Sequence, residues 1–263
     1  MARSAILNIM VQAATKAGRS LTRDFGEVEN LQVSRKGPAD FVSNADNRAE
    51  EIVFEELQKA RPTYSFLMEE SGTVEGTDGQ HRWIVDPLDG TTNFLHSIPL
   101  FACAIALERN GEIVASVIYN PIMEELYTAE RGAGAWLNNR RLRVAGRKKM
   151  SDAVISCGIK VTGTSDDPRT LKQLAAISPT CAGIRRTGSA STELAWLAAG
   201  RIDGFWEARL GAWDVAPGLL LVKEAGGFVT DYAGRANSIQ NGEVVAGNEA
   251  IQAALLKSVQ ASS

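Results

Sequence analysis

The residues best suited to chemistry lie in one short segment, WIVDPLDGTTNF at positions 83–94. An apolar run ends on Asp86, the proline after it predicts a turn, and Asp89 follows three residues after the first aspartate. Gly90 lets the backbone approach a ligand closely, and residues 91–93 predict a helix start, whose free N–H groups suit a phosphate. The segment therefore offers two carboxylates for a cation beside donors for an anion.

Acidic residues also stand at other predicted strand ends and helix starts. Singly, each has an ordinary structural explanation, as a charge at a helix N-terminus or a solvated strand end. Together with Asp86 and Asp89 they would place about five negative charges in one cleft, which is costly without cations because like charges repel. Carboxylates and water are what Mg²⁺ prefers, so we expect two or three Mg²⁺ ions there. The further acids are Asp46, Glu69 and Asp214.

Two amphipathic helices and a sheet are predicted to carry this segment in the first half of the chain. Apolar residues at steps of three and four from Ile6 to Leu21 predict the first helix, and Ser43 predicts the N-cap of a second over residues 44–59. Asn110-Gly111 is a strong hairpin signal between two β-rich runs. We expect two helices on a largely antiparallel sheet, with strands at residues 64–68, 83–85, 101–109 and 112–119.

The second half alternates strand-like and helical runs, which predicts a smaller α/β layer. A polar, basic stretch over residues 138–149 separates the halves. We therefore expect an N-terminal α+β subdomain over residues 1–145, with an antiparallel sheet and the main metal site. A C-terminal α/β subdomain over residues 146–263 would contribute Asp214 and the substrate contacts. Its strands are expected at 153–157, 205–207, 227–231 and 243–246, and its helices at 167–177, 190–199, 214–225 and 248–259.

The composition narrows the classes of function. The 263 residues include 28 cationic and 31 anionic side chains, and the net charge of −3 argues against nucleic-acid binding as the main role. Two histidines exclude a histidine-rich zinc site. Three widely spaced cysteines predict a reducing compartment, and no stretch approaches the roughly 20 apolar residues that span a membrane. We therefore expect a cytoplasmic protein.

Several blocks of the chain resemble the inositol monophosphatase family, of the bacterial inositol-1-monophosphatase or extragenic suppressor type. They occur in the family's order over residues 36–227, and the family belongs to the magnesium-dependent, lithium-sensitive phosphatases. The main blocks are MEES at 68–71, the segment at 83–94, WDVA at 213–216 and EAGG at 224–227. Lesser matches lie at 40–46, 132–138, 185–190 and 205–207.

The resemblance implies a fold and an activity. The fold is a five-layer αβαβα sandwich, shared with fructose-1,6-bisphosphatase and mixing α+β and α/β organisation, and members are usually homodimers. The activity is Mg²⁺-dependent hydrolysis of a small polyol monophosphate, above all myo-inositol 1-phosphate to myo-inositol and phosphate. The attacking group is a metal-activated water, and no covalent intermediate forms.

The resemblance also implies roles for individual residues. The first metal takes Glu69, Asp86 and the backbone carbonyl of Leu88, and a weaker third leans on Glu69. The second metal takes Asp86, Asp89 and Asp214. The catalytic pair that orients the attacking water is Asp46 and Thr91. The substrate-binding residues are Gly90, Thr91, Thr92, Gly188, Ser189, Ala190 and Glu207.

Two alternatives stay open. The metal motifs are equally compatible with histidinol phosphate, fructose 1,6-bisphosphate or a 3′-phosphonucleotide as substrate, although Glu207 favours inositol phosphate. A regulatory protein that binds RNA or the transcription machinery is an alternative of another class. Its basis is a basic run without interleaved aromatic residues, which is more typical of a solvated loop. The run comprises Arg140, Arg141, Arg143, Arg147, Lys148 and Lys149.

Overall fold

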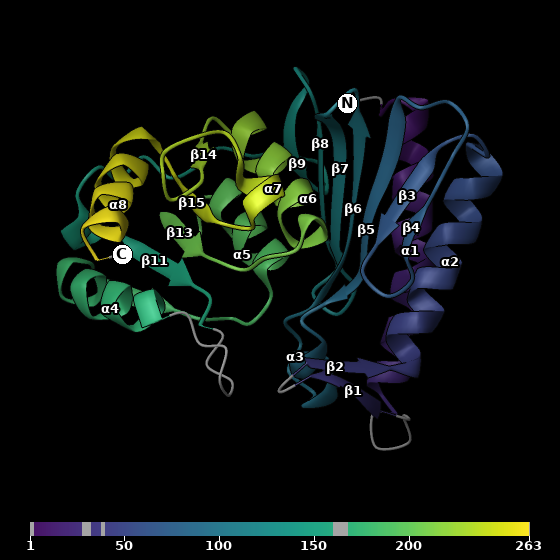
Figure 1. Cartoon of the computed structure of the whole chain (residues 1–263), viewed down its shortest axis with the longest axis horizontal. Helices are drawn as coiled ribbons and strands as arrows, with labels where there is room; N and C mark the ends of the chain where they lie inside the picture. Colours follow the sequence, from purple (N-terminus) through teal and green to yellow (C-terminus); the bar gives the residue numbers. More distant parts are fainter. Residues whose placement is uncertain (1–2, 28–32, 38–39, 160–167, 263) are drawn as a thin grey trace.

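In the described part of the chain, two large β-sheets with helices on both faces of each give five layers in the order αβαβα, and a third sheet has only two strands (Figure 1). The computed structural model describes residues 3–27, 33–37, 40–159 and 168–262. The layer order confirms the five-layer sandwich expected from the resemblance. None of the helices among the described residues is long and apolar enough to cross a membrane.

The first layer consists of helices α1 (Ala5–Phe25) and α2 (Asn44–Ala60), which pack on an eight-stranded sheet. Ser4 and Ser43 cap the two helices by accepting backbone N–H groups. The sheet is antiparallel except for the pair β3–β5, and its order is β10-β9-β8-β7-β6-β5-β3-β4. Its strands are β3 (Ser65–Met68), β4 (Gly72–Val74), β5 (His81–Asp89), β6 (Ala102–Arg109), β7 (Glu112–Asn120), β8 (Glu125–Glu130), β9 (Gly134–Leu137) and β10 (Arg140–Arg141).

Strand β5 carries a bulge close to its end. Asp86 pairs with Ala104 and Asp89 pairs with Ala102, so two residues of β5 oppose the single residue Cys103. Side chains alternate between the faces of a regular strand, so residues three apart would point to opposite faces. The extra residue in the bulge turns Asp86 and Asp89 to the same face, the one towards the middle helices. The turn predicted at Pro87 is therefore wrong: the proline sits in a strand bulge, a position that tolerates its missing N–H.

The middle layer consists of α5 (Ala190–Ala198) and α6 (Ala212–Glu224), which pack between the two sheets. One apolar cluster runs through this layer. It joins Ile84 of the larger sheet, Leu194 and Leu220 of the helices, and Val244 of the smaller sheet. Because both halves share this core, the ends of strands from the first half face the N-termini of helices from the second.

The smaller sheet has the order β12-β11-β13-β15-β14, and helices α4 and α8 cover its outer face. Its strands are β11 (Val154–Cys157), β12 (Gly183–Arg185), β13 (Gly204–Glu207), β14 (Phe228–Thr230) and β15 (Val244–Gly247). The outer helices are α4 (Pro168–Ile177) and α8 (Glu249–Ala261). The remaining elements are β1 (Val33–Gly37), β2 (Asp40–Ser43), α3 (Thr91–Leu95), α7 (Ser238–Asn241) and 3₁₀ turns at Met150–Asp152 and Ser178–Thr180.

All six helices predicted from sequence are present, as is the Asn110-Gly111 hairpin between β6 and β7. Of the larger sheet, the prediction identified β3, β5, β6 and β7 and missed the other strands. The missed strands are short, or, in β8, begin and end on glutamate, so they lack the long alternation that marks a half-buried strand. The sheets change between Arg141 and Val154, but no observation tests a domain boundary at residues 145 and 146, which stays a prediction.

Candidate metal centre and active site

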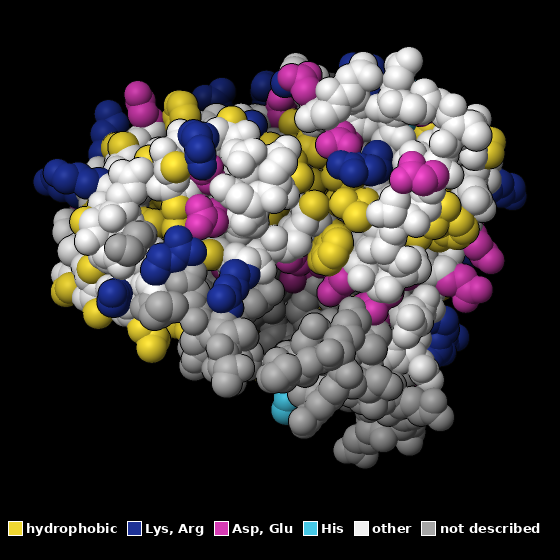
Figure 2. Space-filling view, in the orientation of Figure 1, with side chains coloured by type: hydrophobic (Ala, Val, Ile, Leu, Met, Phe, Trp, Pro, Cys, Tyr) yellow, Lys and Arg dark blue, Asp and Glu magenta, His cyan; other side chains and the backbone are white. Residues whose placement is uncertain are grey.

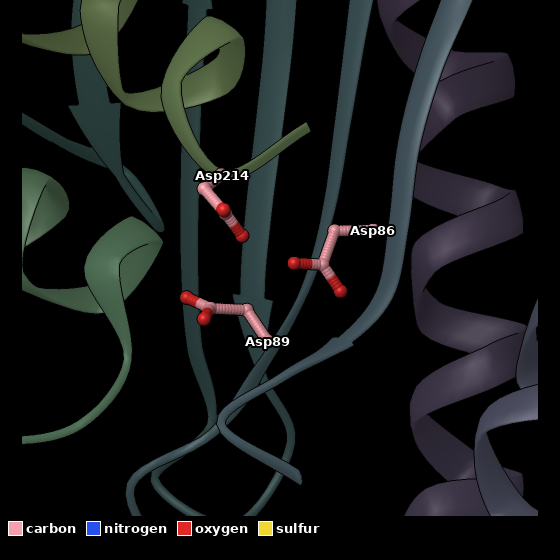
Figure 3. Close-up of side chains that lie close together, drawn as sticks. All are labelled: Asp86, Asp89 and Asp214. Carbon is pink, nitrogen blue, oxygen red and sulfur yellow. The ribbon is translucent and has the colours of Figure 1, made fainter. Parts of the chain in front are cut away.

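Three carboxylates from the two halves of the chain meet at one end of the larger sheet. Asp86 and Asp89 lie on β5, and Asp214 lies in the first turn of α6. One oxygen of each lies within 4.8 Å of the others, and Figure 3 shows the three groups pointing towards one another. In Figure 2, acidic side chains gather in the hollow between the two halves of the molecule. The convergence predicted for these three residues is present in the structure.

Asp86 is at the centre of this cluster and is 1% exposed. Burial raises its pKa well above the usual range, and the negative charges of Glu69, Asp89 and Asp214 raise it further. A hydrogen bond with the Glu69 carboxyl acts in the same direction. Glu69 reaches Asp86 because β3 and β5 run parallel in register, with Met68 beside Val85, so the next residues of the two strands are neighbours. The site therefore concentrates negative charge around Asp86.

Asp214 is held by the helix start on which it lies. Its Oδ2 accepts the backbone N–H of Gly211 at 2.7 Å, which satisfies one of the free donors of α6. The position also places the negative charge at the positive end of the helix dipole. Asp214 is thus a helix N-terminal acid, and it also lies in the acidic cluster where a metal ligand is expected.

Asp89 is held by the start of the other middle helix. Its Oδ2 accepts hydrogen bonds from Ser189 Oγ and from the backbone N–H of Ser191, both at 2.7 Å, and also from the Ser191 hydroxyl. Ser189 is only 1% exposed and also bonds Thr192. The residue predicted to line the substrate pocket therefore contacts a predicted metal ligand directly.

A hydrogen bond of 3.0 Å joins Thr91 Oγ1 to Asp46 Oδ1, as the resemblance implies. Asp46 is fully buried at the start of α2, where its Oδ2 accepts the N–H and the hydroxyl of Ser43. Burial raises the pKa of Asp46, and the hydrogen bonds from Ser43 and Thr91 oppose the rise. The Thr91 hydroxyl also lies 3.1 Å from the carbonyl oxygen of Leu88. A hydroxyl has one proton, so it donates to only one of these two acceptors at a time.

The turn between Asp89 and α3 has the geometry of an anion site. Gly90 has φ +96°, and a Cβ there would approach the Leu100 carbonyl oxygen to 2.9 Å, so the turn requires glycine. The first N–H groups of α3 lack partners within the helix because of helix geometry. Thr91 is half-buried and Thr92 is exposed.

The remaining predicted substrate residues lie on the second half. Gly188 and Ala190 immediately precede or begin α5, and Glu207 ends β13 beside Gly158. A Cβ at Gly158 would overlap the Glu207 carboxyl group, so this glycine makes room for the glutamate. Glu207 is 8% exposed.

Sequence reasoning missed three residues around this site. Besides Ser191, they are Asn93, whose amide donates at 2.7 Å to the carbonyls of Leu100 and Thr187, and Glu193, which accepts the Thr187 N–H at 2.5 Å. Asn93 thereby joins the turn after β5 to the second half. Only Asn93 had a signal in the sequence, its place in the segment at 83–94. Ser191 contacts a residue about a hundred positions away, and Glu193 contacts Thr187 just before α5, so neither belongs to a short motif.

The donor set fits a hard divalent cation. Carboxylate oxygens are what Mg²⁺ prefers, and no histidine or cysteine joins the acidic group among the described residues. The pKa of Asp86 is raised because negative charge gathers in a buried place, and a bound cation would counter that charge.

A five-layer αβαβα fold with clustered carboxylates beside an anion-binding turn defines the class of metal-dependent phosphatases. Residues 2–263 match the inositol monophosphatase family. An inositol-1-monophosphatase from Mesorhizobium japonicum is 66% identical over 260 residues, which cover 99% of this chain and 98% of that protein. The crystal structure of an extragenic suppressor protein suhB from Bartonella henselae has a TM-score of 0.95 and 56% identity, covering 98% of this chain and 99% of that one. A Nus factor SuhB from Escherichia coli strain K12 is 40% identical, covering 97% and 96%.

This chain belongs to the inositol monophosphatase family.

Glu193 makes the stability of the protein depend on pH. Burial raises its pKa to about 7 from an ordinary 4.5, so folding favours the protonated carboxyl. The protonated Glu193 then contributes on the order of 3 kcal/mol to the free energy of unfolding. This contribution is complete below pH 4.5 and is lost as the pH rises towards 7. Glu193→Gln should remove this part of the loss of stability with rising pH, because an amide does not titrate. Its oxygen still accepts the Thr187 N–H, so the variant should fold. The free energy of unfolding, measured by urea titration in EDTA at pH 5 and pH 8, tests this.

The exposed Glu55→Gln is the matched control and should decline as the wild type does. If Glu193→Gln lost as much stability between the two pH values as the wild type, the burial argument would be wrong.

Proposed function

We propose that this protein hydrolyses myo-inositol 1-phosphate to myo-inositol and phosphate in a Mg²⁺-dependent reaction. The observation that carries the proposal is the convergence of Asp86, Asp89 and Asp214 within 4.8 Å, beside the Gly90 turn and the Asp46–Thr91 pair. The name of the Mesorhizobium japonicum relative, at 66% identity, supports the substrate.

The residues that would hold the ions follow the family pattern. Glu69, Asp86 and the Leu88 carbonyl form the first set, and Asp89 and Asp214 join Asp86 in the second. A third ion would lean on Glu69. Bound Mg²⁺ supplies positive charge that acidifies a water and stabilises negative charge on the departing oxygen.

The chain's own groups orient the attacking water. When Thr91 Oγ1 donates to Asp46 Oδ1, its lone pairs are left to accept a hydrogen from that water. The proton that the water loses can then move through the hydroxyl to Asp46, whose raised pKa suits a base. If the Leu88 carbonyl is occupied by a cation, Asp46 is the remaining acceptor, which fixes the direction of the hydroxyl.

The rest of the site would bind the substrate. The N–H groups of Gly90, Thr91 and Thr92 hold the phosphate, and Glu207 accepts hydrogen bonds from ring hydroxyls beside Gly188 and Ala190. Ser189 contributes through Asp89. A covalent serine intermediate is not part of this mechanism. A serine nucleophile needs a base, and among the described residues no hydrogen bond is seen from either histidine of the sequence to Ser189 or Ser191.

A substrate panel tests the proposal. Phosphate release is measured with myo-inositol 1-phosphate, histidinol phosphate, fructose 1,6-bisphosphate and a 3′-phosphonucleotide, each with Mg²⁺ and with EDTA. We expect the highest kcat/KM for the inositol ester and no phosphate release from any substrate in EDTA. A preference for another ester would keep the chemistry and change the substrate, whereas no Mg²⁺-dependent release from any would contradict the proposal.

A regulatory role has one supporting observation, the 40% identity to a Nus factor SuhB. The basic run, however, is partly engaged within the chain. Arg147 pairs with buried Asp203 at 2.8 Å, and the Arg141 guanidinium lies against Gly134. Each of these contacts lies within one half of the chain and engages the arginine in the fold, so we prefer the phosphatase. Neutralising Arg140, Arg143, Lys148 and Lys149 and measuring RNA binding and phosphatase activity separately would distinguish the roles.

Three finer properties complete the proposal on the basis of the family resemblance. They are a homodimer in solution, inhibition by lithium and a cytoplasmic location. Light scattering of the purified protein and a lithium titration of its activity test the first two.

Replacing Asp89 tests the second set of metal ligands. Asp89→Asn is nearly isosteric but removes the charge. In one orientation its NH₂ group would face the three donors that now bind Oδ2, and in the other it would replace the oxygen that faces the acidic cluster. Turnover should fall on the order of a thousandfold. The exposed Asp152→Asn, the same change outside the site, should leave turnover unaltered. More than about a tenth of wild-type activity in Asp89→Asn would contradict the assignment.

Replacing Thr91 tests the orienting pair. Thr91→Ala should lower kcat by roughly a hundredfold, because the water loses its acceptor, with little change in the Mg²⁺ concentration that gives half-maximal activity. Thr91→Ser keeps the hydroxyl and should retain most activity. If the only defect of Thr91→Ala were weaker Mg²⁺ dependence, the threonine would be misassigned.

A further inference from the structure

A second carboxylate of α2, Glu50, faces the site one helical turn after Asp46. It is 6% exposed. Its two oxygens accept the backbone N–H groups of Glu70 at 2.9 Å and Ser71 at 3.0 Å. In the part of the chain whose side chains the structure describes, no lysine or arginine pairs with it. A buried carboxylate is costly, so these two donors are what makes it tolerable here.

The two N–H groups belong to the turn that carries Glu69. Met68 pairs with Gly72, so residues 69–71 form the connection between β3 and β4. On one side the Glu69 N–H donates to the Val85 carbonyl at 3.2 Å, which ties this residue to β5. On the other side Glu50 binds the next two N–H groups. The backbone on both sides of Glu69 is therefore fixed.

A fixed backbone limits the directions open to the Glu69 side chain. It lies close enough to Asp86 to raise the pKa of that residue by its charge and by a hydrogen bond. Repulsion in a cluster of acids would otherwise turn a partly exposed glutamate outward to solvent. A rigid turn opposes this outward movement.

The choice of side chain also needs explanation. Without a cation, a further carboxylate nearby adds to the repulsion in a site that already concentrates negative charge. Packing alone would be served by an apolar residue, whereas two adjacent N–H groups are matched by the two oxygens of a carboxylate.

We propose that Glu50 is a positioning residue for the metal centre: by holding the turn at residues 69–71 it fixes Glu69 as a ligand. The inference rests on the proposed function and deepens it. Helix α2 then supports both strand ends of the site as one rigid element, through Asp46 to Thr91 after β5 and through Glu50 to the turn after β3. Residues that orient a metal ligand without touching the metal typically change metal affinity by about ten- to a hundredfold when they are replaced.

The test measures Mg²⁺ binding by titration calorimetry, together with melting temperature in EDTA. Glu50→Gln keeps the size but turns an NH₂ towards one of the two donors, so Mg²⁺ should bind about tenfold more weakly or worse. Glu51→Gln, the same change at the next and exposed residue of α2, should bind Mg²⁺ as the wild type does. If Glu50→Gln does not fold, Glu50→Asp keeps the charge but shortens the reach, and the same weakening is expected.

A double-mutant cycle shows whether Glu50 affects Mg²⁺ affinity through Glu69. If Glu50 acts through Glu69, then Glu50→Gln should cause no further loss of Mg²⁺ affinity in a protein that already carries Glu69→Gln. Wild-type Mg²⁺ affinity in Glu50→Gln, even with a lowered melting temperature, would overturn the inference and leave only a structural role. An equal loss with and without Glu69→Gln would overturn it as well. A wild-type protein that bound no Mg²⁺ would instead contradict the proposed function.

Discussion

Negative charge gathered in a buried place is the constraint on which the rest of this structure depends. Asp86 is buried among three other acids, and burial and their charges act on its pKa in the same direction. The fold opposes this cost with backbone donors. Asp46, Asp89 and Asp214 each use one oxygen to accept an N–H at the start of α2, α5 and α6 respectively. The three helix starts hold the acids in place, and a divalent cation would supply the remaining positive charge.

The bulge in β5 decides which side of the sheet receives this charge. Ile84 of the same strand faces the middle helices, whereas Val85 and Leu88 pack with the outer ones. In a regular strand Leu88 would share the face of Asp86, and Asp89 would point into the apolar layer beneath α1 and α2. One inserted residue exchanges these two positions, so the carboxylate enters the polar hollow and the leucine enters the core. The packing and the site therefore require the same irregularity.

The two halves have different tasks in the proposed reaction. The larger sheet and α2 supply most of the acids and the Asp46–Thr91 pair, which are the parts common to any ester of phosphate. The smaller sheet and the segment before α5 supply Glu207 and residues 188–190, which in the proposal would face the alcohol. A change at Glu207 would alter the preference for the alcohol and leave the metal ligands in place, which is why metal motifs alone do not identify the ester.

The sequence by itself determined the helices, the hairpin at Asn110-Gly111 and the acids that belong to the site. These features are local, because apolar periodicity, a turn dipeptide and carboxylates beside a glycine-containing turn are all visible within a few residues. The family blocks then indicated the five-layer order. Strands β8 and β9 gave no such signal, since neighbouring strands of the sheet define them more than their own residues do.

Only the tertiary structure decided how the acids are held. The segment at Pro87 appears as a turn in the sequence, but pairing with β6 makes it a bulge, and this pairing depends on a partner strand about fifteen residues away. Ser191 and Glu50 carry no motif. Each became part of the site because a helix start or helix face meets a strand end there, 102 residues away for Ser191 and Asp89 and 20 for Glu50 and Glu70. Contacts of this kind arise from packing of whole elements, which no short stretch of sequence encodes.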